Sequence, residues 1–246
     1  MRWRPLPASE FALCRSARRP RLKVRGLKPD LHGWAALILA GGAGRRFGGG
    51  KLLAPLAGEP LIRRTAEAVG AAGFAEVLVV TGAEHAAIVS ALEGLDCRII
   101  HAVGWAEGMA ASLRAGLAAL PSDTQGLCIF LGDMPLVPVH LCGELARLAS
   151  DAGYAARPRL GGKPGHPACF TRAAFADLLQ LEGDSGANQL LRERESGVAY
   201  CDTDAAGALF DIDSPGDLAA AELAWNARPT SATSDSAMSR GALPKP

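Results

Sequence analysis

Short apolar runs alternate with helix-like stretches along the middle of this 246-residue chain, and this alternation limits the folds that are open to it. Four runs are rich in Val, Ile and Leu without polar alternation, at residues 35–40, 76–82, 97–102 and 127–133. Such runs are typical of strands buried on both faces of a sheet. Helical periodicity marks the stretches between them, at residues 60–72, 84–95 and 111–120. This order predicts an α/β fold with a three-layer, Rossmann-like, mostly parallel, doubly wound sheet.

The second half of the chain is less regular. Residues 138–150 are predicted to be helical, and residues 157–170 to form two short strands around a Gly/Pro turn. We predict a helix over residues 171–181 with Thr171 as its N-cap, and strand ends at residues 198–204 and 208–214. Ser214, Pro215 and Asp217 have the spacing of an N-cap, a first helical residue and a first-turn acid, which predicts a closing helix.

The charge of the chain is distributed unevenly. Residues 1–33 hold 9 basic and 2 acidic residues, which is typical of an Arg-rich targeting peptide or of a disordered extension. A translation start assigned too far upstream would also explain this composition. Residues 228–246 have the small, polar composition of a disordered tail. The predicted domain, residues 34–227, has 14 basic and 22 acidic residues, a net charge of −8. An acidic domain argues against nucleic acid as a partner.

The cysteines and the hydropathy restrict the class of protein further. The six cysteines contain no CxxC pair, which argues against a zinc site and a redox dithiol. Cys97, Cys128 and Cys169 lie in apolar runs, so we expect buried free thiols and a reducing, cytoplasmic location. No apolar run approaches the roughly 18 residues of a membrane span, so no membrane association is expected.

The segment AALILAGGAGRRFGGGKLLAP, residues 35–55, places a glycine-rich loop with positive charge directly after a predicted strand. Glycines let backbone N–H groups approach an anion, because no Cβ intervenes. In open α/β sheets, ligands bind beyond the carboxyl ends of the strands, where this loop must lie. Arg46 and Lys51 add cationic groups that bind phosphate well. The loop is therefore predicted to bind a phosphate group.

Two common phosphate loops do not fit this segment. The P-loop pattern GxxxxGK[ST] fails because Arg45 stands at its first glycine and Leu52 follows the lysine. The dinucleotide pattern GxGxxG begins with Gly42 and Gly44 but has Phe47 at its third glycine. It also lacks an acidic residue at the end of the second strand.

A third pattern matches at every position. LAGGAGRRFGGGKLL resembles the nucleotidyltransferase signature L-A-[AG]-G-x-x-x-R-[MF]-G-x-x-K. Further motifs of that superfamily follow in order: GEPLI, GMAASLRAGLAAL, LGDMPLV, GHPACF, GDSGA and DIDSPGDL. The resemblance covers residues 35–227 and is greatest to the molybdenum cofactor cytidylyltransferases, with the guanylyltransferase branch next. It implies a nucleotide-diphospho-sugar transferase-like fold and the transfer of CMP from CTP to molybdopterin, with Mg²⁺ as cofactor and release of pyrophosphate.

The resemblance also implies roles for individual residues. Arg46, Lys51 and Asp133 are the expected catalytic groups, and Asp133 and Asp211 the expected metal ligands, since Mg²⁺ takes one or two carboxylates. The expected nucleotide-binding residues are Leu39, Ala40, Gly41, Gly42, Gly44, Arg46, Lys51, Thr81, Gly82, Gly108, Met109 and Ser112. The expected acceptor-side residues are His166, Gly183, Asp184, Gly186 and Asp213. Because a phosphate nucleophile is already charged, we expect His166 to shape the site rather than to act as a base.

Three positions bear on the substrates. Gly41 is typical of the guanylyl branch, since cytidylyl members more often have Ala there. Gly50 favours the cytidylyl branch, because the guanylyl branch generally has Asp before the lysine. The motif DIDSP also favours the cytidylyl branch, because the guanylyl branch tends to have Asn where these aspartates lie. Asn188 stands where the family usually has Arg after GA, and this departure concerns the acceptor.

Alternative functions remain open from the sequence. The nearest are a GTP-using molybdenum cofactor guanylyltransferase and a transferase for another phosphate acceptor, such as a sugar or polyol phosphate. A non-catalytic nucleotide-binding module that delivers cofactor is an alternative of a different class. For the functions in molybdenum cofactor synthesis and delivery, the expected protein partner is a molybdenum hydroxylase or its cofactor-insertion chaperone.

Overall fold

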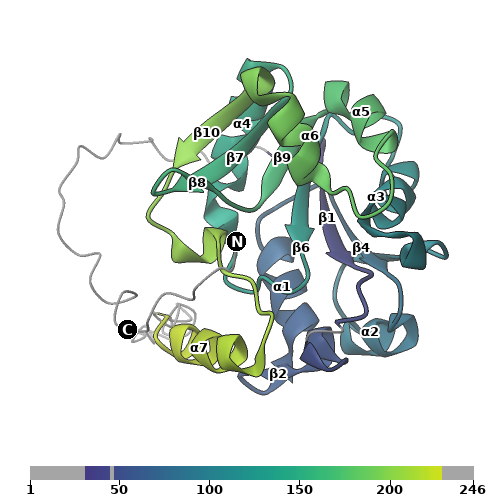
Figure 1. Cartoon of the computed structure of the whole chain (residues 1–246), viewed down its shortest axis with the longest axis vertical. Helices are drawn as coiled ribbons and strands as arrows, with labels where there is room; N and C mark the ends of the chain where they lie inside the picture. The colour runs from purple at the N-terminus through teal and green to yellow at the C-terminus, as the bar shows by residue number, and fades with distance from the viewer. Residues whose placement is uncertain (1–30, 45–46, 229–246) are drawn as a thin grey trace, which may run out of the picture.

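The computed structural model describes residues 31–44 and 47–228, which form a central sheet with helices on both faces (Figure 1). The strands along the sheet are, in spatial order, β10 (Val198–Asp202), β7 (Ala155–Leu160), β9 (Ala168–Thr171), β6 (Gly126–Leu131), β1 (Trp34–Ala40), β4 (Glu76–Thr81) and β5 (Arg98–His101). A short strand, β8 (Lys163–Pro164), pairs with β7 outside this path. The three-layer α/β fold predicted from the sequence is confirmed.

The sheet is parallel except at β8, which runs antiparallel to β7, and at β9. β1 pairs in parallel with β4 on one side and β6 on the other. β9 runs antiparallel to both of its neighbours, β6 and β7. The carboxyl ends of β1 and β6 therefore meet at one edge of the sheet, and Gly132 N donates to Leu39 O there at 2.9 Å. This edge is where side chains that follow β1 and β6 come together.

Helices cover the two faces through separate hydrophobic clusters. On one face lie α1 (Leu61–Gly70), α2 (His85–Ala91) and α4 (Cys142–Ala152), which pack residues such as Ile62, Ile88 and Leu145 onto the sheet. On the other lie α3 (Met109–Ala118), α5 (Phe175–Leu179) and α6 (Ala187–Glu193). The strand side chains alternate between the clusters, with Ile38 in the first and Leu37 in the second. This alternation explains the continuous apolar runs of β1, β4 and β6, because both faces of these central strands are buried.

The last helix, α7 (Pro215–Asn226), begins as the sequence predicts. The Ser214 side chain accepts from Asp217 N, and the Asp217 carboxylate accepts from Ser214 N, which completes a capping box. The helix packs with Phe210 and Ile212 against the hairpin of β2 (Pro55–Leu56) and β3 (Glu59–Pro60). Ile212 N also donates to Asp133 O at 3.1 Å. The segment before α7 is thereby held against the end of β6.

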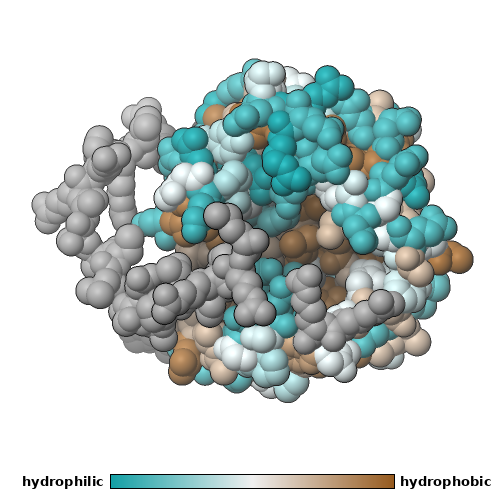
Figure 2. Space-filling view, in the orientation of Figure 1, coloured by the Kyte–Doolittle hydropathy of each residue, from teal (hydrophilic) through white to brown (hydrophobic). Residues whose placement is uncertain are grey.

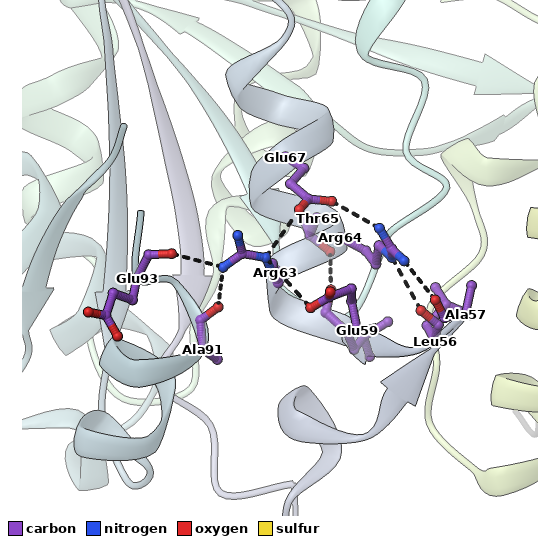
Figure 3. Close-up of polar contacts among 10 residues, drawn as sticks. Leu56, Ala57, Glu59, Arg63, Arg64, Thr65, Glu67, Ala91 and Glu93 are labelled. Atoms are coloured by element: carbon purple, nitrogen blue, oxygen red, sulfur yellow. Dashed lines mark hydrogen bonds and ion pairs between the residues drawn. The ribbon is translucent and has the colours of Figure 1, made fainter. Parts of the chain in front are cut away.

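Two arginines of α1 connect this hairpin to α2 (Figure 3). Arg63 donates to the carbonyl oxygens of Ala91 and Glu93 at the end of α2, at 2.9 and 3.0 Å. Arg64 donates to the carbonyl oxygens of Leu56 and Ala57, and its guanidinium lies 5.2 Å from the centre of the Trp225 ring of α7. Side chains from one helix thus fix the positions of α2, the hairpin and α7.

The secondary structure departs from the sequence prediction in three places. No strand forms over residues 208–214, where a 3-10 turn (Ala206–Ala208) and an extended segment lie instead. Helix α6 was not predicted. Helix α5 is shorter than expected, and the Thr171 hydroxyl does not cap it, because that hydroxyl donates to the carbonyl oxygens of Gly153 and Tyr154.

The prediction of free thiols at Cys128 and Cys169 is wrong in this structure. These two cysteines are direct neighbours in the antiparallel pairing of β6 with β9 and form a disulfide with a Cα–Cα distance of 4.1 Å. Cys97, in contrast, is free. The sequence alone does not reveal the pair, because 41 residues separate its members and their opposition depends on strand register.

The predicted extension of residues 1–33 lies almost wholly outside the described residues, as does most of the predicted tail. Among the residues that the structure describes, no helix is long and apolar enough to cross a membrane.

Candidate nucleotide-binding site

A cavity of about 470 Å³ opens at the carboxyl ends of β1 and β6. On the face drawn in Figure 2, apolar residues gather near the centre, where Figure 1 shows these strands ending. Sixteen residues line it: Leu39, Ala40, Gly41, Gly42, Ala43, Gly44, Lys51, Leu52, Trp105, Ala106, Gly108, Met109, Ser112, Leu131, Asp133 and Asp184. The glycine-rich loop therefore forms one wall, and the start of α3 forms another.

Backbone geometry explains why glycines occupy this loop. Gly44 has φ +58°, and a Cβ there would lie 3.1 Å from Lys51 Cβ. Gly50 also has a positive φ, +65°, and its N–H donates to Glu84 Oε1 at 2.8 Å. The loop is thus tied to the start of α2 just before Lys51, which directs the lysine toward the cavity.

Lys51 lies between two carboxylates from distant segments. Its Nζ lies 2.6 Å from Asp133 Oδ2 and 3.0 Å from Asp213 Oδ1. Burial opposes the charge of Lys51, but the Asp133 and Asp213 carboxylates outweigh it and raise the pKa of the lysine above its ordinary value. Lys51 is therefore fully protonated at neutral pH.

Asp133 has one oxygen without a partner. Asp133 Oδ2 accepts from Lys51, but Oδ1 is enclosed and has no hydrogen-bond partner among the described residues. Asp211 lies near, and its burial together with the charges of Asp213 and Asp133 raises its pKa. Concentrated negative charge and an unpaired carboxylate oxygen are what a hard divalent cation requires. Within the described ranges, no group of three or more His, Cys, Asp or Glu residues is arranged to hold a metal ion.

Most of the predicted nucleotide-binding residues line this cavity, whereas Thr81 and Gly82 do not. Arg46 lies outside the described residues. Thr81 is fully buried; its hydroxyl shares a hydrogen bond with His85 Nδ1 at 2.7 Å and donates to Ile100 O. Gly82 lies behind the wall, where the absence of a Cβ lets Trp105 pack closely. The base-contact predictions for Thr81 and Gly82 therefore gain no support from their positions.

The predicted acceptor-side residues lie in three different places. Gly183, Asp184 and Gly186 lie against the start of α3: Gly183 O accepts from Ala110 N at 3.0 Å, and Asp184 lines the cavity of the glycine-rich loop. His166 lines a second cavity of about 480 Å³. Burial and the nearby Arg157 charge lower the pKa of His166 to about 4, so the ring is neutral at pH 7. Asp213 instead faces Lys51.

Sequence reasoning missed two sets of cavity residues. Trp105, one of only four tryptophans in the sequence, lines the first cavity together with Ser112, and its position three residues before the first glycine of the GMAAS motif was a usable signal. Arg157 and Arg192 line the second cavity. Nothing in their local sequence distinguishes them from surface charges.

Comparisons with known proteins agree with this geometry. The family described as "MobA-like NTP transferase domain" matches residues 36–198. A molybdenum cofactor guanylyltransferase from Cereibacter sphaeroides is 33% identical over 189 residues, 76% of this chain and 94% of that protein. Nicotine blue oxidoreductase from Paenarthrobacter nicotinovorans is 32% identical over 196 residues, 75% of this chain and 94% of that protein. The crystal structure of an rv0371c homologue from Mycobacterium sp. strain JC1 matches with a TM-score of 0.69 at 25% identity, over 78% of this chain and 98% of that one.

Proposed function

Because the chain belongs to the MobA-like NTP transferase family, we propose that it transfers a nucleoside monophosphate from a nucleoside triphosphate to the molybdopterin form of molybdenum cofactor. The observation that carries this proposal is the meeting of the glycine-rich loop, Lys51 and Asp133 around one cavity. Glycine N–H groups and a protonated lysine suit a triphosphate, and the carboxylate suits its divalent cation.

The chemistry needs stabilisation of charge more than proton transfer. A phosphate oxygen of the acceptor attacks the α-phosphorus, the bond from that phosphorus to the α–β bridging oxygen breaks, and pyrophosphate leaves with the bonding electrons. Negative charge develops on the phosphate oxygens and the leaving group. In this proposal, Lys51 offsets this charge. A neutral His166 is consistent with the absence of a base, since the attacking phosphate is already ionised.

Asp133 and Asp211 are the residues that would hold the metal, and Mg²⁺ is the proposed ion. The enclosed, unpartnered Asp133 Oδ1 fits this role. When bound, the ion would neutralise charge on the triphosphate oxygens. Lys51 already offsets one Asp133 oxygen, so the remaining oxygen is the one available to a cation.

CTP is the proposed donor, and GTP is the second candidate. Gly50 and the motif DIDSP favour CTP, whereas the guanylyltransferase named among the relatives supports GTP. Gly41 lies at the position that distinguishes the branches, and here a Cβ would lie 2.7 Å from Ser112 Oγ. Gly41 and Ser112 therefore fit each other sterically, and both face the cavity.

The name of nicotine blue oxidoreductase describes that relative alone. A dinucleotide-dependent redox function gains no support here, because Phe47 interrupts the GxGxxG pattern.

The decisive experiment measures pyrophosphate release by the full chain with molybdopterin and CTP, GTP or ATP, in Mg²⁺ or Mn²⁺. We expect pterin-dependent release with CTP preferred. Preference for GTP would identify the guanylyl reaction, and release that depends instead on a sugar or polyol phosphate would identify another acceptor. No acceptor-dependent release with any nucleotide would refute the enzyme proposal and favour a cofactor-delivery module.

A further inference from the structure

A second cavity lies beside the nucleotide cavity and carries an excess of positive charge. It is formed by β7, the turn before β9, α6 and the segment before α7, and it shares Leu131 with the first cavity. Its charged lining residues are Arg157, Arg192 and Asp211. No ion pair joins either arginine to a carboxylate among the described residues. The formal charge of the lining is therefore +1.

Arg157 is the unusual member, since it is a buried arginine without an acidic partner. The residue is 6% exposed, and its Nε donates to Gly165 O at 3.0 Å. Within the described ranges, the enclosed polar side-chain atoms that lack hydrogen-bond partners belong to Glu76, Asp133 and His166, and none belongs to Arg157. Since the terminal nitrogens of Arg157 make no hydrogen bond to the described residues and are not enclosed, they are accessible from the cavity that this residue lines. An arginine is almost never this buried unless it is paired, because an uncompensated buried charge is costly.

Arg192 of α6 adds a second cation to the same cavity. Burial lowers the pKa of Arg157, and the like charge of Arg192 acts in the same direction. The other polar groups nearby, His166 and Asn188, carry no charge at neutral pH. Two like charges facing a cavity are stabilised by an anion bound between them. Guanidinium groups bind phosphate oxygens in pairs.

We propose that Arg157 and Arg192 bind the phosphate group of the acceptor and thereby determine acceptor specificity. The proposal rests on the proposed nucleotidyl transfer, because it places the attacking phosphate next to the cavity that holds the triphosphate. Asp211, which lines this second cavity and lies near Asp133, marks the side that faces the reacting phosphorus. The same chemistry also suits the pyrophosphate product, and the test must separate these two sources.

The test uses three full-length variants: Arg157→Met, Arg192→Gln and the control Arg159→Met. Arg159 lies on the same strand but pairs with Asp202 outside the cavity. Loss of one charged hydrogen-bond donor predicts a rise of about 10- to 100-fold in KM for molybdopterin. The KM for the nucleotide stays within about twofold, since these residues do not line its cavity. Arg192 is exposed, so its variant keeps the test valid if Arg157→Met fails to fold.

Binding of inorganic phosphate by calorimetry, with the nucleotide site filled by a non-hydrolysable CTP analogue, gives a readout independent of turnover. We expect both cavity variants to bind phosphate more weakly than wild type and Arg159→Met. Unchanged phosphate binding and unchanged KM for molybdopterin would overturn the proposal. A rise in the KM for the nucleotide, or a loss of inhibition by pyrophosphate, with an unchanged KM for molybdopterin would also overturn it, because the arginines would then bind the pyrophosphate product rather than the acceptor. If the wild-type protein transfers no nucleotide but both cavity variants still bind phosphate more weakly than it does, the proposed function is refuted and the anion-binding role of the two arginines is supported.

Discussion

Replacement of Lys51 by Met tests the central feature of the proposed site. In the structure, Lys51 Nζ makes two charge-assisted contacts, 2.6 Å to Asp133 and 3.0 Å to Asp213. The methionine would keep most of the side-chain volume and remove the charge. If Lys51 offsets the charge that develops on phosphate oxygens, its loss should affect turnover far more than folding.

The expected losses follow from the contacts. A hydrogen bond to a charged group contributes about 1.5–3 kcal/mol, but the Asp213 side chain is 45% exposed, so solvent screens that contact. We therefore expect a loss of about 2 kcal/mol of stability, which lowers Tm by about 4–8 °C for a domain of this size. Loss of a preorganised cation in the site should lower kcat/KM by about 100- to 1,000-fold.

The assay is pyrophosphate release with saturating molybdopterin, together with thermal unfolding of each variant. Lys51→Arg keeps the charge and should retain more activity than Lys51→Met. Arg147→Met is the control, because Arg147 is exposed on α4 and its ion-pair partners among the described residues are its helix neighbours Glu144 and Asp151. If Lys51→Met lowers Tm but keeps kcat/KM within about threefold of wild type, Lys51 is a structural residue and the reasoning fails.

Three further predictions concern other parts of the chain. Asp133→Asn should remove at least about 99% of activity and abolish the thermal stabilisation produced by Mg²⁺ with nucleotide; an intact metal response would contradict the assigned ligand. Ser214→Ala removes one half of the capping box and should cost about 1 kcal/mol, or about 2–4 °C in Tm, with kcat unchanged. For His166, a folded pKa of about 4 lies below the ordinary value of 6.5, so the unfolded state binds the proton more readily and stability falls as pH drops from 6.5 toward 4. His166→Asn should flatten that part of the stability–pH curve, and an equally steep curve for the variant would show that other groups cause the acid sensitivity.

The elements that the sequence predicted well are those with strong local patterns. The four apolar runs became β1, β4, β5 and β6. In β1, β4 and β6 both faces are buried, which requires apolar residues at nearly every position, whereas in the edge strand β5 only the two central isoleucines are partly buried. The capping box at Ser214 was also readable, since its two members are three residues apart. The strand expected at 208–214 failed because that segment packs against α7 and the end of β6 rather than joining the sheet.

The candidate site was predictable only in part, because only some of its residues belong to local sequence patterns. The spacing of the glycine-rich loop and of LGDMP identified Lys51 and Asp133. Arg157 was not found, because a charged residue in a predicted strand usually faces solvent, and only its burial without an acidic partner distinguishes it.

By itself, the sequence determined the α/β architecture, the position of the glycine-rich loop after β1 and the start of α7, because periodicity, glycines and caps act over a few residues. The tertiary structure alone decided which distant groups meet. Lys51 contacts carboxylates 82 and 162 positions away, and Cys128 meets Cys169 across a strand pair. Such contacts depend on strand order and register, which are set by the burial of the whole sheet between two layers of helices rather than by any local pattern.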